Sequence, residues 1–476
     1  MPVQTVRIRD FPWRTTNIFG IFGKGCRTLL EGLKRFFAVR AGRLFVFALG
    51  LSFLLGFSVL RPTPAKAGDA EVKVVPKKSA GVKSRGTVRK ASLRRRASRG
   101  KSGRIFASGN GSVKSPWIIR TAAQMEALAR SVNQGNSYSG KRIRLVADLD
   151  LSGMRWNPIG FYREGGSRPF KGVFDGNGHV VRGLDVKAPA AGMAGLFGVL
   201  EGATVVGLTI EDASVSAGPN VGILAGLAIR SELRNCAVSG SVLGTENVGG
   251  VIGQTSESRL SGLSFSGAVN GRGSGTGGLI GSMFGTLLAR AEVRGEISGQ
   301  DNVGGLAGNV REGELNEART WELTVQGRKT VGGMIGFASD SVVIRRSLFD
   351  GTVEGRENTG GLVGWVESGN LTGNSVSGSV LGWERTGGVA GLWGDGLARR
   401  CIVEATVSGT SDVGGLAGRM EKGLANQCES LGYVEGGKSV GGLVGEMVSG
   451  RLEKCMASGS VKGALTSGRE IGSTSR

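Results

Sequence analysis

A pair of adjacent glycines recurs along this chain at a nearly constant spacing. The first glycine of the pair lies at position 249 and returns at 277, 304, 332, 360, 387, 414 and 441, so each step is 27 or 28 residues. Two weaker copies of the same six-residue motif precede it, at residues 193–198 and 221–226. A fixed period of this size is the signature of a repeat architecture, and the surfaces of such proteins commonly bind a partner.

A second motif, Gly-x-Val-x-Gly, accompanies most of the glycine pairs. Its central residue is Val or Ile in every copy, as at residues 240–244, 267–271 and 295–299, which suits a short strand with one buried face. A third apolar stretch, such as residues 452–457, lies between the two motifs. Three short strands per period predict an all-β fold. We expect a parallel β-solenoid of about ten turns, each of 27–28 residues, whose stacked turns share one core.

Alternation along the strand after each glycine pair predicts which side chains face the core. Leu279, Gly281 and Met283 alternate on one face, which we assign to the interior. The residue two positions before the first glycine is small and polar in most turns. We expect it to make turn hydrogen bonds and to stack between turns. The members of this set are Asn220, Asn247, Asn302, Thr330, Asn358, Asp412 and Ser439.

The cysteines of the repeat region share one register. They are Cys236, Cys401, Cys428 and Cys455. Leu263 and Ala291 occupy the same register, which favours a buried apolar position, whereas Arg319, Ser347 and Asn374 break that rule. Free and mostly buried thiols are the favoured interpretation. One disulfide between stacked neighbours and a metal site are the alternatives.

The first 67 residues resemble an export signal in their pattern. Arginines at 35, 40 and 43 precede a largely apolar run at 44–60, and residues 65–67 form a small-x-small sequence of the kind that signal peptidase cleaves. The alternative is an uncleaved membrane anchor, since the run is barely long enough to cross a bilayer. Either interpretation predicts a secreted or surface-exposed protein.

Positive charge is concentrated before residue 116. Residues 68–115 carry 14 Lys or Arg against 2 Asp or Glu, whereas residues 116–476 carry 35 against 34. Residues 68–115 contain almost no aromatic side chain, so we predict a disordered basic linker. Such a linker could adhere to an anionic polymer of the cell envelope. Because the remaining chain is nearly neutral, the high isoelectric point does not predict a nucleic-acid-binding protein.

Residues 116–190 depart from the repeat. The segment 121–129 predicts a helix capped by Thr121, with Met125, Leu128, Ala129 and Val132 on one face, and atypical strands follow it. The end of a solenoid exposes strand edges that invite pairing. We therefore expect residues 116–190 to form a capping module and residues 191–476 to hold the regular repeats.

The repeat and the module before it together resemble a known family. The Gly-Gly-Leu-Val-Gly sequences at 360–364 and 441–445 resemble the GLUG repeat of bacterial surface proteins, and residues 117–179 resemble the module that commonly precedes it. The resemblance implies a right-handed β-helix that is secreted or exposed on the cell surface. It also implies an adhesin-like protein or the N-terminal part of a surface peptidase, with no cofactor.

Carboxylates of the capping module are the candidate catalytic groups. Asp148, Asp150 and Asp175 could act as paired carboxylates on a polysaccharide, although Asp175 also begins an ordinary turn sequence. The chain has a single histidine, His179, and no clear metal-ligand spacing, so we expect neither a metal site nor a cofactor.

Three consecutive turns break the pattern at the position after the last glycine of the motif. This residue is polar in most turns, but it is Phe337, Trp365 and Leu392 in these three. If the position faces outward, the three side chains stack into an apolar stripe, with Trp383 nearby in a loop. Exposed apolar surface marks an interaction site, and aromatic rings suit a sugar or a protein. Packing beneath a loop is the alternative.

These features favour a binding or adhesion protein that presents a repetitive surface to an extracellular glycan or a surface protein. Phe337, Trp365, Leu392 and Trp383 are the candidate binding residues. A polysaccharide-active enzyme that uses the acidic residues of the capping module is one alternative. A structural spacer of the cell envelope is the other.

Overall fold

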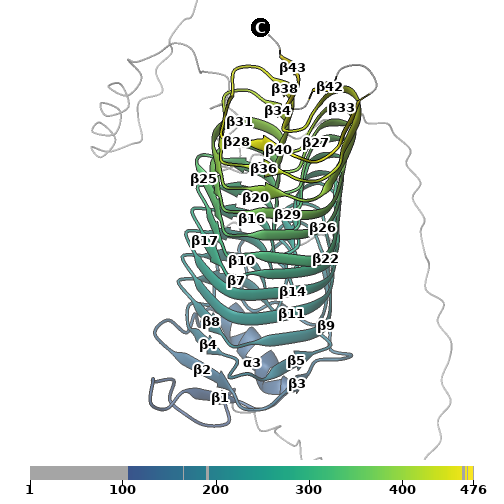
Figure 1. The fold of residues 1–476 in the computed structure, drawn as a ribbon. Coiled ribbons are helices and arrows are strands. Elements are labelled where there is room, and N and C mark those ends of the chain that lie inside the picture. Colours follow the sequence, from purple (N-terminus) through teal and green to yellow (C-terminus); the bar gives the residue numbers. More distant parts are fainter. Residues whose placement is uncertain (1–104, 164–165, 189–191, 464–466, 469, 475–476) are drawn as a thin grey trace, which may run out of the picture. The chain divides into compact units, whose positions relative to one another are not determined.

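The computed structural model of the chain describes residues 105–163, 166–188, 192–463, 467–468 and 470–474. These residues form a parallel β-solenoid of about 13 turns with almost no helix, and Figure 1 shows the turns stacked along one axis. The predicted all-β solenoid is therefore confirmed, although it has more turns than the expected ten. The predicted export signal and the linker up to residue 104 lie outside the described residues. Among the described helices, none is both long and apolar enough to cross a bilayer.

Each regular turn contributes strands to four columns, which we number in chain order from the glycine pair. Column 1 follows the pair and consists of β7 (Phe197–Glu201), β10 (Ala225–Ile229), β13 (Ile252–Ser256), β16 (Ile280–Phe284), β20 (Ala307–Arg311), β24 (Ile335–Ser339), the starts of β28 (Val363–Thr372) and β31 (Ala390–Arg399), β34 (Ala417–Met420), β38 (Val444–Met447) and β43 (Ile471–Thr474).

Column 2 extends over the whole described stack. It consists of β1 (Trp117–Ile119), β2 (Arg142–Leu145), β4 (Val173–Asp175), β8 (Thr204–Val206), the starts of β11 (Glu232–Gly244) and β14 (Arg259–Gly271), β17 (Leu287–Ala289), β21 (Glu314–Asn316), β25 (Val342–Arg345), the ends of β28 and β31, β35 (Leu424–Asn426) and β39 (Arg451–Glu453). Its first three strands come from the module at 116–190, which lacks the repeat motif that contains the glycine pair. The number of glycine pairs therefore underestimates the number of turns.

Column 3 carries the Gly-x-Val-x-Gly motif. It consists of β3 (Leu149–Asp150), β5 (Val180–Arg182), β6 (Asp185–Ala188), β9 (Thr209–Ala217), the ends of β11 and β14, β18 (Glu292–Ser298), β22 (Arg319–Gln326), β26 (Leu348–Glu354), β29 (Ser375–Leu381), β32 (Ile402–Val403), the start of β33 (Thr406–Gly414), β36 (Glu429–Ser430), the start of β37 (Val434–Gly441), β40 (Met456–Ala457) and β41 (Val461–Gly463). The central Val or Ile of the motif is buried from Val242 to Val434, as expected.

Column 4 is short and leads into the next glycine pair. It consists of β12 (Val248–Gly249), β15 (Ser274–Gly277), β19 (Asp301–Gly304), β23 (Lys329–Gly332), β27 (Glu357–Gly360), β30 (Glu384–Gly387), the ends of β33 and β37, and β42 (Ser467–Gly468). The sequence predicted three strands per turn, and this column is the additional one.

The glycine pair forms the corner between columns 4 and 1: its first glycine ends the strand of column 4, and its second glycine lies between the two strands. β23 ends at Gly332, and β24 begins at Ile335. A Cβ added to Gly333 would overlap the carbonyl oxygen of Gly361 in the next turn, and Gly361 has the same relation to Gly388. Close contact between stacked corners therefore requires glycine at the second position of the pair.

The polar residue two positions before the first glycine adopts a left-handed backbone conformation. Asn247 has a φ of 50°, and its Nδ2 donates a hydrogen bond to Oδ1 of Asn220 at 3.0 Å. Arg385, which is not small, also has a positive φ (54°), and its Nε donates to Oδ1 of Asn358. The expected turn role and the stacking between turns are both confirmed, since asparagine tolerates this conformation well.

The cysteine register is a buried column of hydrogen-bond acceptors. The backbone N–H of Cys401 points at Sγ of Cys428 at 3.5 Å, and that of Cys428 points at Sγ of Cys455 at 3.5 Å. Ser347 and Asn374 perform the same task with oxygen, because Ser347 N donates to Oδ1 of Asn374 at 3.0 Å. The polar members therefore fit a buried register, since each satisfies a backbone donor of the preceding turn.

One sequence assignment in this register is wrong. Ala318, and not Arg319, lies next to Ala291 in the stack, because Glu292 pairs with Arg319. Ala318 is fully buried. The error arose because this turn is one residue shorter at that point. All four described cysteines are free thiols, and Cys455 is the one that is partly exposed, so the expectation of free, mostly buried thiols is confirmed.

The helix α3 (Ala122–Asn133) closes the N-terminal end of the core. The side chain of Thr121 accepts a hydrogen bond from the backbone N–H of Gln124, as predicted for a cap. Met125, Leu128 and Val132 are completely buried, and Figure 1 shows α3 at the end of the stack beside β3 and β5. The helix thus covers apolar side chains that the first turns would otherwise expose.

Part of the segment assigned to the basic linker belongs to the folded unit. Ala107 N donates to the carbonyl of Ile118 at 2.8 Å, and Ile118 N donates to the carbonyl of Ser108 at 3.0 Å. The ring of Phe106 stacks on Trp117 with 4.7 Å between centroids. The aromatic stacking and backbone pairing therefore extend the ordered structure back to residue 105, before the composition changes.

Candidate functional site

Phe337, Trp365 and Leu392 lie side by side on column 1, and we call them the outer row. Phe337 pairs with Trp365 in register, and Trp365 pairs with Leu392. The rings of Phe337 and Trp365 are 4.9 Å apart between centroids. All three side chains are partly exposed, whereas their strand neighbours Val366 and Trp393 are fully buried. The three residues therefore face outward and stack, as the alternation of the strand requires.

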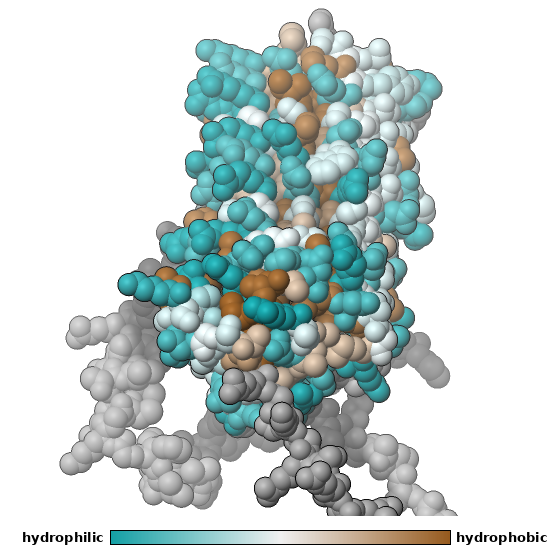
Figure 2. Space-filling model, turned by 90° about the horizontal axis from the view of Figure 1, so that it is seen from below, coloured by the Kyte–Doolittle hydropathy of each residue, from teal (hydrophilic) through white to brown (hydrophobic). Residues whose placement is uncertain are grey.

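Polar groups flank the outer row on both sides along the rod. Asn309, which pairs with Phe337, accepts a hydrogen bond from Nδ2 of Asn302 at 2.8 Å. Arg419, which pairs with Leu392, forms an ion pair with Glu446 at 2.9 Å. Figure 2, which views the molecule from below, shows apolar patches among polar side chains on that face. An apolar centre within a polar rim is the usual arrangement of a binding surface.

The charged end of this surface holds one half-buried carboxylate. Burial, together with the nearby charge of Glu446, raises the pKa of Asp412, although Arg419 and Arg385 oppose the shift. Arg385 is engaged with Glu357 in the neighbouring turn. The charges next to the outer row are therefore largely neutralised within the protein, and they do not form a field of one sign.

Trp383 lies outside the outer row. It occupies the corner between columns 3 and 4, before β30, and 58% of its surface is exposed. The guanidinium carbon of Arg356 lies 4.8 Å from the centroid of its ring. Trp383 therefore lies in a loop, as expected, but at a corner away from column 1, and its described ring contact is with Arg356.

The three candidate catalytic carboxylates are each held by local partners. Asp148 accepts hydrogen bonds from Val180 N at 3.1 Å and lies 3.0 Å from Nδ1 of His179. The Val180 hydrogen bond, followed by that of His179, lowers the pKa of Asp148. Hydrogen bonds from Ser152 lower the pKa of Asp150. Both groups are therefore ionised at neutral pH and lack the raised pKa that a general acid needs.

Asp175 has a structural role. Its Oδ2 accepts from Nε of Arg144 at 2.9 Å, and its Oδ1 accepts from the backbone of Asn177 at 3.0 Å. Asn177 and Gly178 both have positive φ, so the predicted turn is confirmed. None of these contacts directs the three carboxylates toward a shared substrate atom.

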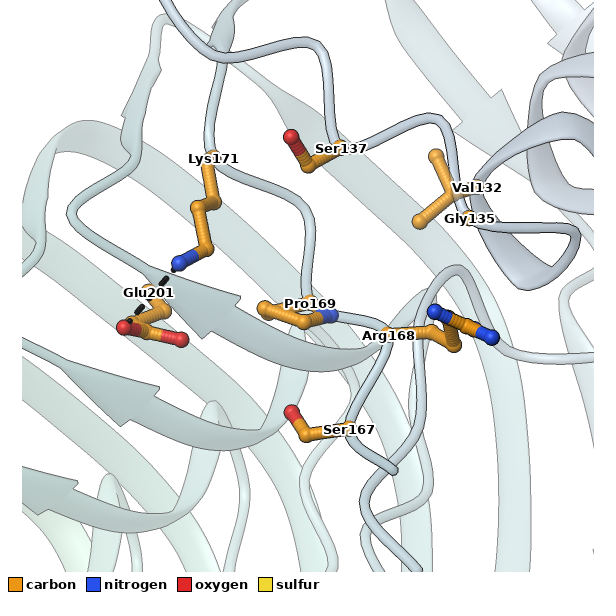
Figure 3. Close-up of a pocket in the computed structure, with 8 residues that line it drawn as sticks. All are labelled: Val132, Gly135, Ser137, Ser167, Arg168, Pro169, Lys171 and Glu201. Carbon is orange, nitrogen blue, oxygen red and sulfur yellow. Dashed lines mark ion pairs between the residues drawn. The ribbon is translucent and has the colours of Figure 1, made fainter. Parts of the chain in front are cut away.

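A small pocket of about 270 Å³ lies at the capped end, where the loop after α3 meets the segment leading to β4. Figure 3 shows Lys171 and Glu201 facing each other across one side of it, with an ion pair of 3.2 Å, and Arg168 on the other side near Gly135. Ser137 and Ser167 line its edges. Glu201 also forms an ion pair with Arg230 at 3.4 Å. The carboxylate at this side of the pocket is therefore shared between two basic side chains.

Comparisons with known proteins place parts of this chain beside two named relatives. It is 36% identical over 159 residues to "Halomucin" of Haloquadratum walsbyi, which covers 31% of this chain and 2% of that protein. It is 32% identical over 97 residues to "Putative Gly-rich membrane protein" of Evansella cellulosilytica, which covers 20% of this chain and 11% of that protein. The chain therefore spans only a small part of the length of either relative. No protein-family model matches the chain.

The chain also has a weak likeness to a solved structure. It is the crystal structure of a "putative immunoglobulin A1 protease" from Bacteroides ovatus, with a TM-score of 0.39 and 18% sequence identity. The match covers 63% of this chain and 80% of that one. A likeness this weak carries no argument about activity.

Two features escaped the sequence reasoning because they combine residues from different turns. The pocket of Figure 3 joins the loop after α3 to residues 167–171 and 201. The surroundings of Trp383 join residues from three successive turns. A signal was present for the second, since positions 328, 356 and 383 are equivalent in the repeat and hold Arg, Arg and Trp.

Proposed function

We propose that this chain is a secreted or cell-surface β-solenoid of the GLUG type that binds a glycan or a surface protein through its outer row. One observation carries the proposal: Phe337, Trp365 and Leu392 face outward on consecutive turns. An aromatic centre with polar surroundings, which becomes buried when a partner binds, is typical of the residues that dominate binding energy. A rod of about 13 turns, about 60 Å long at 4.8 Å per turn, would hold this surface away from its attachment point.

The comparisons support a surface-associated location. The relatives are named as a halomucin and a Gly-rich membrane protein, and the apolar run at residues 44–60 fits an export signal or an anchor. The binding interpretation is preferred over the enzyme alternative because Asp148 and Asp150 both have lowered pKa values and local partners.

The basic segment before the solenoid suggests a second contact with the envelope. Residues 68–104 carry 13 Lys or Arg against 2 Asp or Glu, which is half of the net positive charge of the chain. We propose that this segment adheres to an anionic polymer or lipid surface. Such adhesion would weaken steeply as salt is raised, because exposed charges are screened over about 10 Å at 0.1 M ionic strength.

The outer row is tested by binding of the full chain to intact bacterial cells and to immobilised glycans. The variants are Phe337→Ser and Trp365→Ser, and the matched control is Leu348→Ser, which removes an exposed apolar side chain outside the row. We expect each variant to weaken binding at least about tenfold, because central aromatic side chains contribute more than 1 kcal/mol. The control should bind as the native chain does.

Treatment of the target cells identifies the kind of partner. Loss of binding after periodate oxidation indicates a glycan, and loss after protease treatment indicates a protein. Unchanged binding in both row variants would overturn the proposal and leave the structural-spacer interpretation. Cleavage of a glycan that Asp148→Asn abolishes would instead support the enzyme.

A further inference from the structure

A recess of about 290 Å³ opens at the corner between columns 3 and 4, where β22, β26 and β29 end. Three successive turns build it, so that it runs along the rod. One wall holds Gln326, Glu354 and Leu381, which are paired in register. The other wall holds Arg356 and Trp383. We call this the corner recess.

The floor of the corner recess is bare backbone. Gly327, Gly355 and Gly382 lie between the two walls in the three turns. A Cβ on Gly355 would collide with the side chain of Thr359, and one on Gly382 would collide with that of Thr386. Core packing therefore requires glycine at these corners, and the glycine backbone forms the floor of the recess.

The polar groups of the recess are of several kinds and lie close together. Gln326 donates from Nε2 to Oε2 of Glu354 at 3.0 Å, which leaves the other carboxylate oxygen and the amide oxygen for further contacts. The Arg356 guanidinium lies 4.8 Å from the Trp383 centroid. No ion pair of Arg356 occurs among the described residues. Its guanidinium N–H groups are therefore available to a ligand.

Trp383 provides the apolar surface of the site. It stays 58% exposed although Arg356 lies over its ring, so the indole retains a large open area. Leu381 beside it is 38% exposed. A large aromatic ring with one face toward solvent costs free energy unless a ligand covers it.

We propose that the corner recess binds a saccharide, with one pyranose ring stacked on Trp383. The C–H face of a pyranose is apolar and matches an open indole, while its hydroxyl groups project at the rim of the ring. Glu354 and Gln326 would accept hydrogen bonds from those hydroxyls, and Arg356 would donate to them. Gln326, the pair of Glu354 and Arg356, and Trp383 lie on three successive turns. The site is therefore matched to a chain of sugars that runs along the rod.

A saccharide fits the recess better than an anion or an apolar peptide does. The carboxylate of Glu354 in the wall disfavours a phosphate or a strongly acidic ligand, whereas Arg356 and Gln326 disfavour an apolar one. Small-molecule sites commonly combine an aromatic lining with a few polar groups in a volume of about 300 Å³ or more. The recess is at the lower limit of that range, which suits one or two sugar rings.

The inference deepens the proposed function, but it stands on different residues. The outer row lies on β24, β28 and β31, whereas the recess lies at the ends of β22, β26 and β29. Loss of the recess would therefore leave the row intact. The two sites can fail separately, and variants in each distinguish them.

The test is titration of the full chain with soluble tetrasaccharides, followed by calorimetry or saturation-transfer NMR. The probes are cellotetraose, mannotetraose, chitotetraose and a tetragalacturonate. We expect at least one neutral probe to bind, Trp383→Ala to weaken it at least tenfold, and Glu354→Gln to weaken it severalfold. Tyr162→Ala is the matched control, since Tyr162 is 60% exposed and lies outside the recess. It should bind as the native chain does.

Three outcomes would overturn the proposal. The first is that none of the four probes binds. The second is binding that Trp383→Ala leaves unchanged. The third is binding that Trp365→Ser abolishes and Trp383→Ala does not, which would move the saccharide to the outer row. If Trp383→Ala alters the unfolding temperature, Gln326→Ala provides a second variant in the opposite wall, because Gln326 is exposed and its removal leaves the core untouched.

Discussion

At the scale of single residues, equivalent positions in successive turns act as internal controls for one another. One inward column beneath the glycine corners holds valine in six turns and threonine in three. Its members are Val221, Val248, Thr276, Val303, Val331, Thr359, Thr386, Val413 and Val440. Thr276, Thr359 and Thr386 are completely buried, and their hydroxyl groups have no hydrogen-bond partner among the described residues. The column therefore contains three buried hydroxyl groups in an otherwise apolar environment.

Replacing these threonines with valine should stabilise the protein. Thr359→Val and Thr386→Val each remove an unsatisfied buried hydroxyl at nearly constant shape, and we expect a gain of about 1 kcal/mol for each. Valine fits, because Val331 already packs beneath Gly327 in the same way. The free energy of unfolding in urea measures the gain. Thr406→Val, at an exposed position, is the control and should change stability little. A loss of stability in both core variants would show that the hydroxyls are satisfied.

The buried thiol of Cys236 predicts a loss of stability at alkaline pH. Burial raises its pKa from 9.0 to about 11. As the pH rises, the thiol ionises at a lower pH in the unfolded chain than in the folded one. The stabilisation from the buried neutral thiol is therefore complete below pH 9 and is lost as the pH rises through the folded pKa of about 11. A shift of two pKa units corresponds to on the order of 3 kcal/mol. Unfolding at pH 8 and pH 10.5 should show a larger loss in the native chain than in Cys236→Ala. An equal loss in both would contradict the prediction.

At the scale of strands and corners, glycine serves two different purposes in this solenoid. The second glycine of each pair is required because stacked corners touch, as Gly333 touches Gly361. Other glycines supply a left-handed backbone in open space. Gly373 has a φ of 64° and no atom within 4 Å of an added Cβ. Arg346 and Arg400 adopt the same conformation in the turns before and after it. A glycine count does not separate these two roles.

Substitution should therefore lower the stability strongly at the first kind of glycine and only slightly at the second. Gly333→Ala forces the corner away from the Gly361 carbonyl, and we expect a loss of at least about 2 kcal/mol, as for other overpacked sites. Gly373→Asn keeps the backbone conformation and meets no neighbour, so its cost should be a few tenths of a kcal/mol at most. Thermal unfolding of both variants under the same conditions measures the two losses of stability. Similar losses in both would mean that backbone conformation, and not contact, sets the requirement.

The same comparison shows how far the sequence could predict the elements. The period and the apolar alternation were sufficient for the parallel solenoid and for the inward face of Leu279 and Met283, which are buried. They could not show that the glycine pair is a corner, because its glycines are required by contacts with the next turn, and the sequence of a single repeat does not reveal such contacts. They also misplaced Ala318 by one residue, since turns of 27 and 28 residues shift the register. For the site, equal spacing predicted the stacking of Phe337 on Trp365. The corner recess depends on side chains from three turns and a glycine floor, which no single motif contains.

At the scale of the whole molecule, each turn contacts mainly the turns before and after it. The capping module differs because α3 adds Met125, Leu128 and Val132 to the end of the core. An aromatic cluster joins it, in which Trp117 lies 5.4 Å from Tyr138 between centroids. In repeat structures, stability is approximately a sum of the stability of each turn and of the interfaces between neighbours. We therefore expect a destabilising substitution at one end to unfold neighbouring turns only where the interfaces between turns are weak.

A charge beneath the cap tests this expectation. Leu128→Glu buries a carboxylate against the end of the core, where it has no charged partner among its buried neighbours, at a cost of several kcal/mol. We expect hydrogen exchange to accelerate in β1, β2 and β4, while β22, β26 and β29 near the corner recess keep their protection. Glu126→Gln, on the exposed side of α3 where Glu126 pairs with Arg130 at 2.6 Å, is the control and should leave exchange unchanged. Uniform acceleration along all columns would show that the solenoid unfolds as one cooperative unit. Saccharide binding at the corner recess would then depend on the cap as well as on its own three turns.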